Sequence, residues 1–144
     1  EYWHDPVKTE ATIKNGYLHT GDLASMDEEG FFYLVGRAGD MDITGGENVY
    51  PAEVEKALKT HPDIEEVAVI GILDEKWGET GHAFVIKKPD SSLSANAVIA
   101  ICTGKLAKYK WPKKVTFKTQ FPRTSLGKIK KADLMDDTFK KNNS

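Results

Sequence analysis

Asp22 and Lys128 each follow a glycine, and both carry a charge that could act on a ligand. An ionised carboxylate has several acceptor sites, so Asp22 beside Gly21 could accept hydrogen bonds from both hydroxyls of a ribose. The ammonium group of Lys128 sits on a flexible stem after Gly127, and it could neutralise a carboxylate and a phosphate together. Taken singly, these residues also allow a plain turn aspartate and a solvated surface lysine.

Two loops place aromatic rings beside charged residues, a setting in which a large ring has little local reason to lie. The first is the loop 74–79 and the second is the basic loop 108–114. A ring in such a loop can stack on adenine, and ammonium groups can bind phosphates. Packing within the protein's own fold is an equal alternative for each ring. The side chains concerned are Trp77, Tyr109, Trp111 and Lys113.

The run 36–55 lies between Asp22 and Lys128 and changes character halfway. Its first half mixes a cation, acids and glycines, a composition that packs poorly and leaves the backbone free to turn or to approach a ligand. Its second half begins a helix, because Pro51 suits the first helical position and an apolar face follows it. The Gly45-Gly46 pair ahead of this helix fits a ligand loop and an ordinary turn equally well.

The hydrophobic pattern predicts the elements that must position these residues. Branched and aromatic residues favour strands, and apolar residues at helical spacing favour helices. A hairpin is expected to pair 20–26 with 31–35. Further strands are expected at 67–73, 81–87 and 115–117, and helices at 51–60, from the N-cap Ser94 through Leu106, and at 131–141 with Leu134, Met135 and Phe139. The fold class is therefore α+β: a small domain with a central sheet packed by helices, preceded by a β-hairpin.

Composition restricts the class of protein further. With 144 residues, 40% of them hydrophobic and 29% charged, the chain can bury one modest core. No apolar run approaches the ~20 residues that cross a bilayer, so no transmembrane segment is expected. The single cysteine, Cys102, excludes an internal disulfide, argues against a cysteine-rich metal site and favours a reducing, cytoplasmic setting. We expect Cys102 to lie in the core and no residue to bind a metal.

The net charge of -2 conceals an asymmetry. From Lys105 onward the chain has 12 Lys and Arg against 3 Asp and Glu, whereas the preceding part has 8 against 19. A tail of +9 could bind an anionic partner or could simply be a solvated face. Its basic residues include no recognised nucleic-acid motif, so nucleic acid is not the expected partner.

Three stretches, 16–23, 36–55 and 122–129, resemble motifs of the AMP-forming acyl-CoA synthetases in the expected order. This adenylate-forming superfamily also includes luciferases and peptide-synthetase adenylation domains. The sequence Gly-Gly-Glu-Asn-Val-Tyr-Pro resembles the fatty-acyl and aryl members most. The resemblance implies that residues 1–38 end a large adenylation domain and that 39–144 form a mobile C-terminal domain. The lack of an initiator methionine favours a piece of a longer polypeptide.

The resemblance also implies roles for single residues. Lys128 corresponds to the catalytic lysine of the adenylation step. ATP or AMP would be bound by Asp22, Arg37 and Lys128, and the hinge would be Gly39 and Asp40. CoA would be bound by Gly45, Gly46 and Glu47 along the pantetheine and by Trp77, Tyr109, Trp111 and Lys113 at the nucleotide, with Trp111 matching by position only.

Three residues depart from the family's pattern. Gly39 stands where the pivot is usually aspartate or lysine, and it would loosen the hinge. Asp42 stands where an apolar residue is usual, and Lys131 replaces an arginine. These departures affect rates and local packing rather than the core motifs.

The function implied is that of the C-terminal part of an ATP-dependent acyl-CoA synthetase. The enzyme would use ATP, Mg²⁺ and CoA, bound together with the N-terminal domain, to adenylate a carboxylic acid and pass the acyl group to CoA. The chain alone is expected to be inactive. Two alternatives remain: an adenylating enzyme that loads a carrier-protein thiol, and a non-enzymatic basic module that binds nucleic acid.

Overall fold

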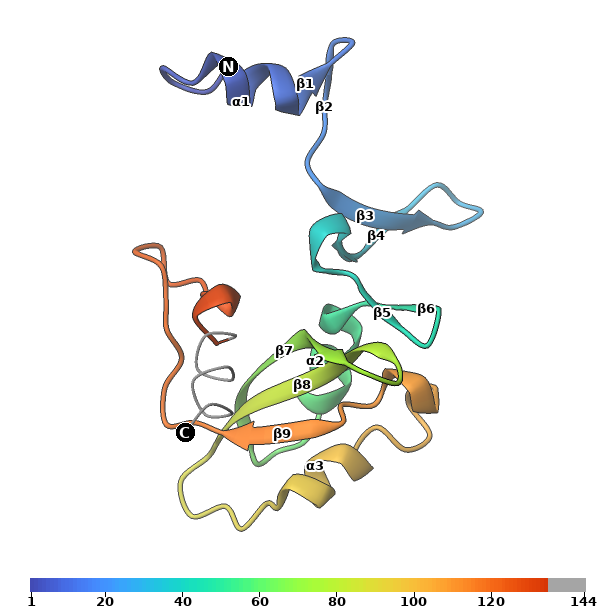
Figure 1. The fold of residues 1–144 in the computed structure, drawn as a ribbon, viewed down its shortest axis with the longest axis vertical. Coiled ribbons are helices and arrows are strands. Elements are labelled where there is room, and N and C mark those ends of the chain that lie inside the picture. Colours follow the sequence, from blue (N-terminus) through green and yellow to red (C-terminus); the bar gives the residue numbers. More distant parts are fainter. Residues whose placement is uncertain (135–144) are drawn as a thin grey trace. The chain divides into compact units, whose positions relative to one another are not determined.

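The structure, a computed structural model, describes residues 1–134 (Figure 1). Its contacts divide the chain into two compact units, Glu1–Gly39 (unit 1) and Asp40–Ser144 (unit 2). The short 3-10 turn η1, Ala38–Asp40, contains the boundary. Residues 131–134 are helical, as expected for the start of the last helix, whereas Met135 and Phe139 lie outside the described residues.

Unit 1 consists of short elements with little burial. Helix α1, Pro6–Thr12, is capped by Asp5, whose Oδ1 accepts a hydrogen bond of 2.8 Å from the Lys8 amide. The pair β1 and β2, Ile13–Lys14 and Tyr17–Leu18, follows it, and β3 and β4, Asp22–Met26 and Phe32–Arg37, then form the expected antiparallel hairpin.

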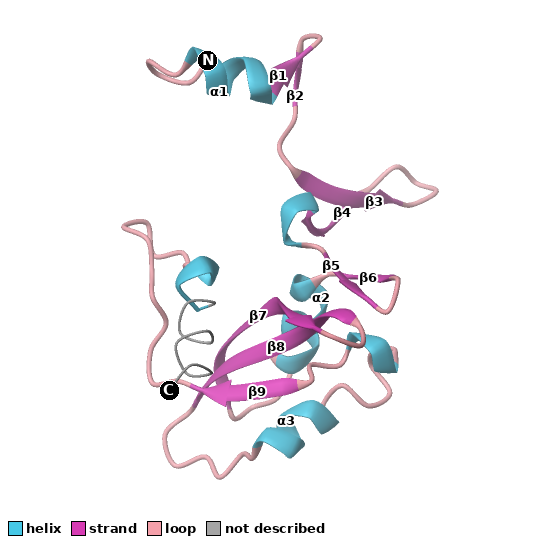
Figure 2. Cartoon of the chain, in the orientation of Figure 1, coloured by secondary structure: helices cyan, strands magenta, loops and turns pink. Residues whose placement is uncertain are grey.

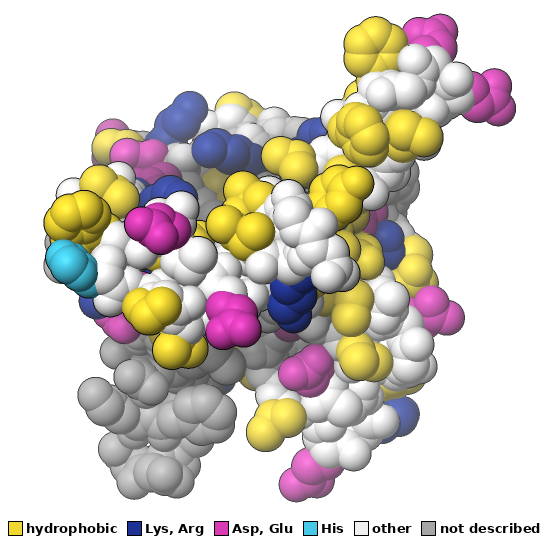
Figure 3. All heavy atoms as spheres, turned by 90° about the horizontal axis from the view of Figure 1, so that it is seen from above, with side chains coloured by type: hydrophobic (Ala, Val, Ile, Leu, Met, Phe, Trp, Pro, Cys, Tyr) yellow, Lys and Arg dark blue, Asp and Glu magenta, His cyan; other side chains and the backbone are white. Residues whose placement is uncertain are grey.

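No residue of 1–39, all of which the structure describes, is buried. Phe32 and Leu34 on β4 are 74% and 79% exposed, and Figure 3 shows apolar side chains, in yellow, at the surface. A two-stranded hairpin without a buried face has marginal stability by itself.

Unit 2 is built on a five-stranded sheet, with β7, β8 and β9 side by side in Figure 2. Strand β8 pairs with β7 along its length, with β5 at Gly78 only and with β9, in parallel, over residues 82–85. Because β7 occupies one edge of β8, β5 and β9 share the other edge. The elements of this unit are β5 Asp42–Thr44, β6 Glu47–Val49, α2 Pro51–Leu58, β7 Ile64–Asp74, β8 Gly78–Lys87, α3 Ala95–Ala100, η2 Lys108–Lys110 and β9 Lys114–Phe117.

Alternate residues of the long strands pack into two separate cores. Val67 and Val69 belong to a cluster with α2 and α3 that includes Cys102, which is fully buried as expected. Their neighbours Ala68 and Ile70 belong to a second cluster that includes Leu134 and is contacted by Ile129. The sheet is therefore covered on both faces, and the α+β prediction of a central sheet packed by helices is confirmed.

The structure corrects two details of the predicted elements. Ser94 is the N-cap of α3, since its hydroxyl accepts from the Ala97 amide at 3.2 Å, but the helix ends at Ala100 instead of Leu106. Turns replace the helix there, and Gly104 adopts a φ of +73° that a helix does not tolerate. The hairpin β5–β6 was not predicted, because its strands are only three residues long.

Asp42 on β5 is buried to 9% exposure, and its Oδ2 has no hydrogen-bond partner among the described residues. Its carboxylate occupies the space beside Gly71, where an added Cβ would lie 2.1 Å from Oδ1. Burial raises the pKa of Asp42 to about 6 and is the largest cause of the shift. The carboxylates of Glu79 and Asp40 also raise this pKa, whereas Lys131 lowers it.

We predict that Asp42→Asn stabilises the chain at neutral pH but not in acid. The folded pKa of about 6 lies above the ordinary aspartate pKa of 3.8, so folding is penalised only at pH values where the carboxyl must ionise. The penalty is absent below about pH 4, grows as pH rises to about 6 and reaches at most about 3 kcal/mol above it. Urea unfolding of both proteins at pH 4 and pH 7.5 measures it.

The matched control is Glu65→Gln, which neutralises an exposed carboxylate on β7. Its effect on the free energy of unfolding should not change between the two pH values. A D42N effect of equal size at pH 4 and pH 7.5 would contradict the assigned pKa.

Candidate functional site

A pocket of about 460 Å³ opens on unit 2 where three segments of the chain meet. Thr44 comes from β5, Trp77 from the turn between β7 and β8, and the remaining residues from η2 and the segment before β9. Figure 1 shows these segments, in turquoise, light green and orange, near the same end of strands β7 and β8. The lining residues are Thr44, Trp77, Lys108, Tyr109 and Lys113.

Trp77 is held in the pocket by two turns. Asp74 Oδ1 accepts hydrogen bonds of 2.9 Å from the amides of Lys76 and Trp77, which closes the β7–β8 turn. On the other side, the Gly45 amide donates to the Trp77 carbonyl at 2.8 Å. The indole of Trp77 lies so close to Gly45 that a Cβ there would be 2.9 Å from Cε3.

Gly45 and Gly46 form the two-residue turn of the β5–β6 hairpin, with φ values of +60° and +88°. Two positive φ angles in succession define the turn type that matches the twist of a hairpin, and glycine adopts them at no steric cost. The glycine pair is thus a hairpin turn, and through the hydrogen bond of Gly45 this turn also holds Trp77 in the pocket. Glu47, the first residue of β6, follows it and is exposed.

Two ammonium groups lie near the Trp77 ring. Lys113 Nζ is 5.7 Å and Lys76 Nζ is 5.1 Å from its centroid. Of the two, Lys113 lines the pocket, together with Lys108. The site therefore combines flat apolar rings with at least two cations, which suits a ligand that has both an aromatic ring and phosphates.

The turn η2 carries Tyr109 and is tied to α2 by an ion pair. Lys110 Nζ lies 2.7 Å from Glu53 Oε2. Trp111, just after η2, packs against the first core, and its indole N–H donates to the Leu106 carbonyl at 3.0 Å. The structure therefore brings Trp77, Tyr109 and Lys113 together and directs Trp111 away from them.

Sequence reasoning overlooked two lining residues, Thr44 and Lys108. Lys108 belongs to the basic loop already singled out, and its charge could have identified it. Thr44 precedes the glycine pair, and only the hairpin brings it beside Trp77. Its Oγ1 is buried and has no hydrogen-bond partner among the described residues.

Lys128 is exposed and belongs to a separate loop of unit 2, outside the pocket lining. Its amide donates to Thr124 Oγ1 at 3.2 Å, and its carbonyl accepts from the Thr124 amide at 2.8 Å. Gly127, just before it, has a φ of +80°. The backbone of Lys128 is thus fixed while its side chain reaches into solvent.

Asp22 and Arg37 lie opposite each other at the end of the β3–β4 hairpin in unit 1. Arg37 Nε is 3.0 Å from Asp22 Oδ1, and both side chains are accessible. Gly21, before Asp22, has a φ of +77°. Gly39 and Asp40 lie in η1, at the boundary between the units.

No cluster of three or more His, Cys, Asp or Glu side chains within residues 1–134 could hold a metal ion. The described helices include none that is long and apolar enough to cross a membrane.

Residues 53–128, more than half of the chain, match the family described as the AMP-binding enzyme C-terminal domain. The chain belongs to this family, which confirms the resemblance seen in its motifs. Among curated relatives, the indoleacetate–CoA ligase of Aromatoleum aromaticum is 46% identical over 133 residues, covering 92% of this chain and 26% of that protein.

Two solved structures agree with this assignment. ATP-bound MatB from Rhodopseudomonas palustris has a TM-score of 0.83 at 38% identity, over 94% of this chain and 27% of that one. The o-succinylbenzoate CoA synthetase MenE from Bacillus subtilis, in complex with its acyl-adenylate intermediate, has a TM-score of 0.81 at 42% identity, over 87% and 25%. The chain thus spans about a quarter of the length of the proteins it matches.

We predict that Gly45→Ala displaces the Trp77 ring whereas Gly46→Ala does not. Both substitutions place a Cβ at positive φ and should each cost about 1–2 kcal/mol of stability. Only the Cβ at position 45 meets the ring, since position 46 has no atom within 4 Å. The indole N–H resonances in an NMR spectrum separate the cases: that of Trp77 should shift in G45A alone, and equal spectra for the two variants would disprove the contact.

Proposed function

We propose that the chain is the C-terminal part of an ATP-dependent, AMP-forming acyl-CoA synthetase, an acid–thiol ligase. The observation that carries this proposal is the pocket of unit 2, whose rings and ammonium groups suit the nucleotide of CoA. Membership of the AMP-binding C-terminal family and the names of the CoA ligases that resemble the chain support it. Residues 1–38 would end the adenylation domain, and 39–144 would form the mobile domain.

In this proposal the pocket binds the adenine nucleotide of CoA. Trp77 and Tyr109 offer flat surfaces for the base, and Lys108 and Lys113 offer positive charge for the phosphates. Thr44 lines the pocket beside them, although its hydroxyl oxygen is itself buried. Gly45, Gly46 and Glu47 would border the pantetheine arm. Trp111 does not line the pocket; its partly buried ring packs against the first core, so a contact with CoA is left as an expectation from the resemblance.

Lys128 would act in the first half-reaction. A carboxylate oxygen attacks the α-phosphorus of ATP, a new oxygen–phosphorus bond forms, and the bond to pyrophosphate breaks. The ammonium of Lys128 offsets the negative charge that gathers during this exchange. Asp22 would accept hydrogen bonds from the ribose hydroxyls, and its partner Arg37 fixes the direction of its carboxylate. Mg²⁺ would accompany ATP and share in charge neutralisation.

The second half-reaction would use the pocket. The thiol of CoA attacks the acyl carbon of acyl-AMP, the thioester forms, and AMP leaves. Rotation about Gly39 and Asp40 would exchange Lys128 for the glycine loop at the reacting centre. A mobile connection suits this role, because hinge motions are absorbed by a few residues at element ends.

Two alternatives differ from this proposal in their partners. An enzyme that loads a carrier-protein thiol would not need a nucleotide pocket, so a CoA-dependent thioester assay distinguishes it. A nucleic-acid module would show salt-dependent binding to oligonucleotides. We also propose a cytoplasmic location, in keeping with the unpaired, buried Cys102.

The function of Lys128 is tested by Lys128→Ala in the full-length enzyme. Acyl-AMP formation should fall by orders of magnitude, while thioester formation from supplied acyl-AMP stays nearly unchanged, because an interaction affects only the step whose transition state contains it. Lys130→Ala, which removes a neighbouring exposed lysine, is the control and should change neither step. Residues 1–144 alone should form no acyl-AMP. Equal losses in both steps would disprove a role confined to adenylation.

The CoA pocket is tested by comparing the two lysines near Trp77. Lys113→Ala should raise the KM for CoA several-fold, and Trp77→Ala should raise it about tenfold, since stacking a base on a ring is worth about 1–3 kcal/mol. Lys76→Ala removes an ammonium at similar distance from the ring but outside the pocket lining, and it should leave this KM unchanged. Steady-state kinetics with varied CoA decide the matter; identical effects of K113A and K76A would count against the site.

A further inference from the structure

We propose that Arg123 and Glu66 are positioning residues for Lys128: their ion pair ties the loop that carries Lys128 to the central sheet. This inference rests on the proposed function, because it assumes that Lys128 acts in acyl-AMP formation. It adds two residues that lie outside the pocket; Arg123 belongs to the stretch 122–129, but neither residue was given a role from the sequence.

The loop that carries Lys128 has little packing of its own. Residues 125–128 are all exposed, and Leu126 at its tip is 84% exposed. Its ends are joined by an isolated β-bridge between Arg123 and Ile129, and Ile129 contacts the second core. Packing of Ile129 anchors one end of the loop, whereas the tip, which buries no apolar side chain, depends on hydrogen bonds.

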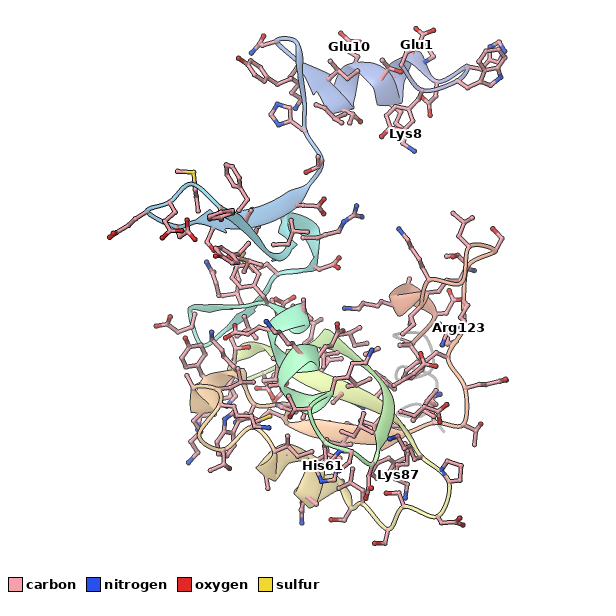
Figure 4. All side chains as sticks on the ribbon, turned by 180° about the vertical axis from the view of Figure 1, so that it is seen from behind. Glu1, Lys8, Glu10, His61, Lys87 and Arg123 are labelled. Carbon is pink, nitrogen blue, oxygen red and sulfur yellow. The ribbon has the colours of Figure 1, made fainter. Side chains whose placement is uncertain are left out.

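The guanidinium group of Arg123 makes the bond that joins this loop to the most distant part of the sequence. Arg123 Nη1 donates to the carbonyl of Gly127 at 2.9 Å, directly before Lys128. Its Nη2 contacts the carboxylate of Glu66, 57 residues earlier in the chain, on β7. Figure 4 labels Arg123 on the orange segment that follows β9. A single side chain thus connects the loop's tip to a long strand of the sheet.

Arginine is suited to this task in a way that lysine is not. The planar guanidinium presents several N–H donors in a fixed fork, so it can bind a carboxylate and a backbone carbonyl at once. The Glu66 and Arg123 side chains are 32% and 40% exposed, so the pair is expected to add little to overall stability. Its effect should appear in geometry instead, because a displacement of about 1 Å of a catalytic group can cost about 100-fold in rate.

The test uses the full-length enzyme with Arg123→Ala, Glu66→Ala and the double variant. Acyl-AMP formation should fall tenfold or more in each single variant, and the double variant should be no slower than R123A, because both residues act through one contact. Thioester formation from supplied acyl-AMP should stay within twofold. Arg123→Lys keeps the charge but not the fork, and it should restore only part of the rate.

Amide hydrogen exchange tests the same proposal without measuring catalysis. In the 1–144 chain, amide hydrogen exchange at Gly127 and Lys128 should accelerate in R123A, while exchange in β7 and β8 stays unchanged. Lys130→Ala, which breaks the exposed pair with Asp133 in the same segment, should not have this effect. Faster exchange throughout the sheet would instead indicate a general folding defect and would overturn the inference.

The proposed role of Lys128 and the positioning role of the ion pair can be disproved separately. If K128A leaves acyl-AMP formation unchanged, the proposed role of Lys128 is wrong. If K128A slows that step but R123A and E66A do not, or if the single effects simply add, the role of Lys128 stands and the positioning role of the ion pair is overturned.

Discussion

Strand β8 is the constraint on which the rest of unit 2 depends. It is hydrogen-bonded on both edges, and residues 80–86 of it are all buried. Pro112 packs beside Gly81 within it, and the Gly81 carbonyl accepts from the Lys113 amide at 2.8 Å. This hydrogen bond fixes the segment that supplies Lys113 to the pocket. The turn at the start of β8 supplies Trp77.

The pocket and the loop of Lys128 are built at different places but by the same means. In each, a segment bearing cations is tied by an ion pair to an element of regular structure: Lys110 to Glu53 on α2, and Arg123 to Glu66 on β7. The two ion pairs share no residue. In the proposed function one small domain serves two chemical steps, so the residues for each step must be held in place separately.

The sequence predicted the long elements well, because their apolar patterns are strong. Strands β7 and β8, helix α2 and the N-cap Ser94 all lie where the pattern indicated. The pattern could not show that the Gly45-Gly46 turn joins two strands, since three-residue strands have almost no periodicity.

Nor could the sequence separate Trp77 from Trp111. Both lie in loops that mix aromatic and charged residues, and only tertiary packing turns one ring to the pocket and the other to the core. Asp42 is unusual for its position in the sequence, but its neighbour Gly71, nearly thirty residues later, explains how a carboxylate fits there.

The open edges of β3 and β4 have a further consequence. Among residues 1–134 each of these strands has a single paired neighbour, so unpaired backbone groups run beside the exposed side chains of Phe32 and Leu34. Such an edge is a template for strand addition between molecules, so we expect unit 1 to be a site of association in a concentrated solution of this chain.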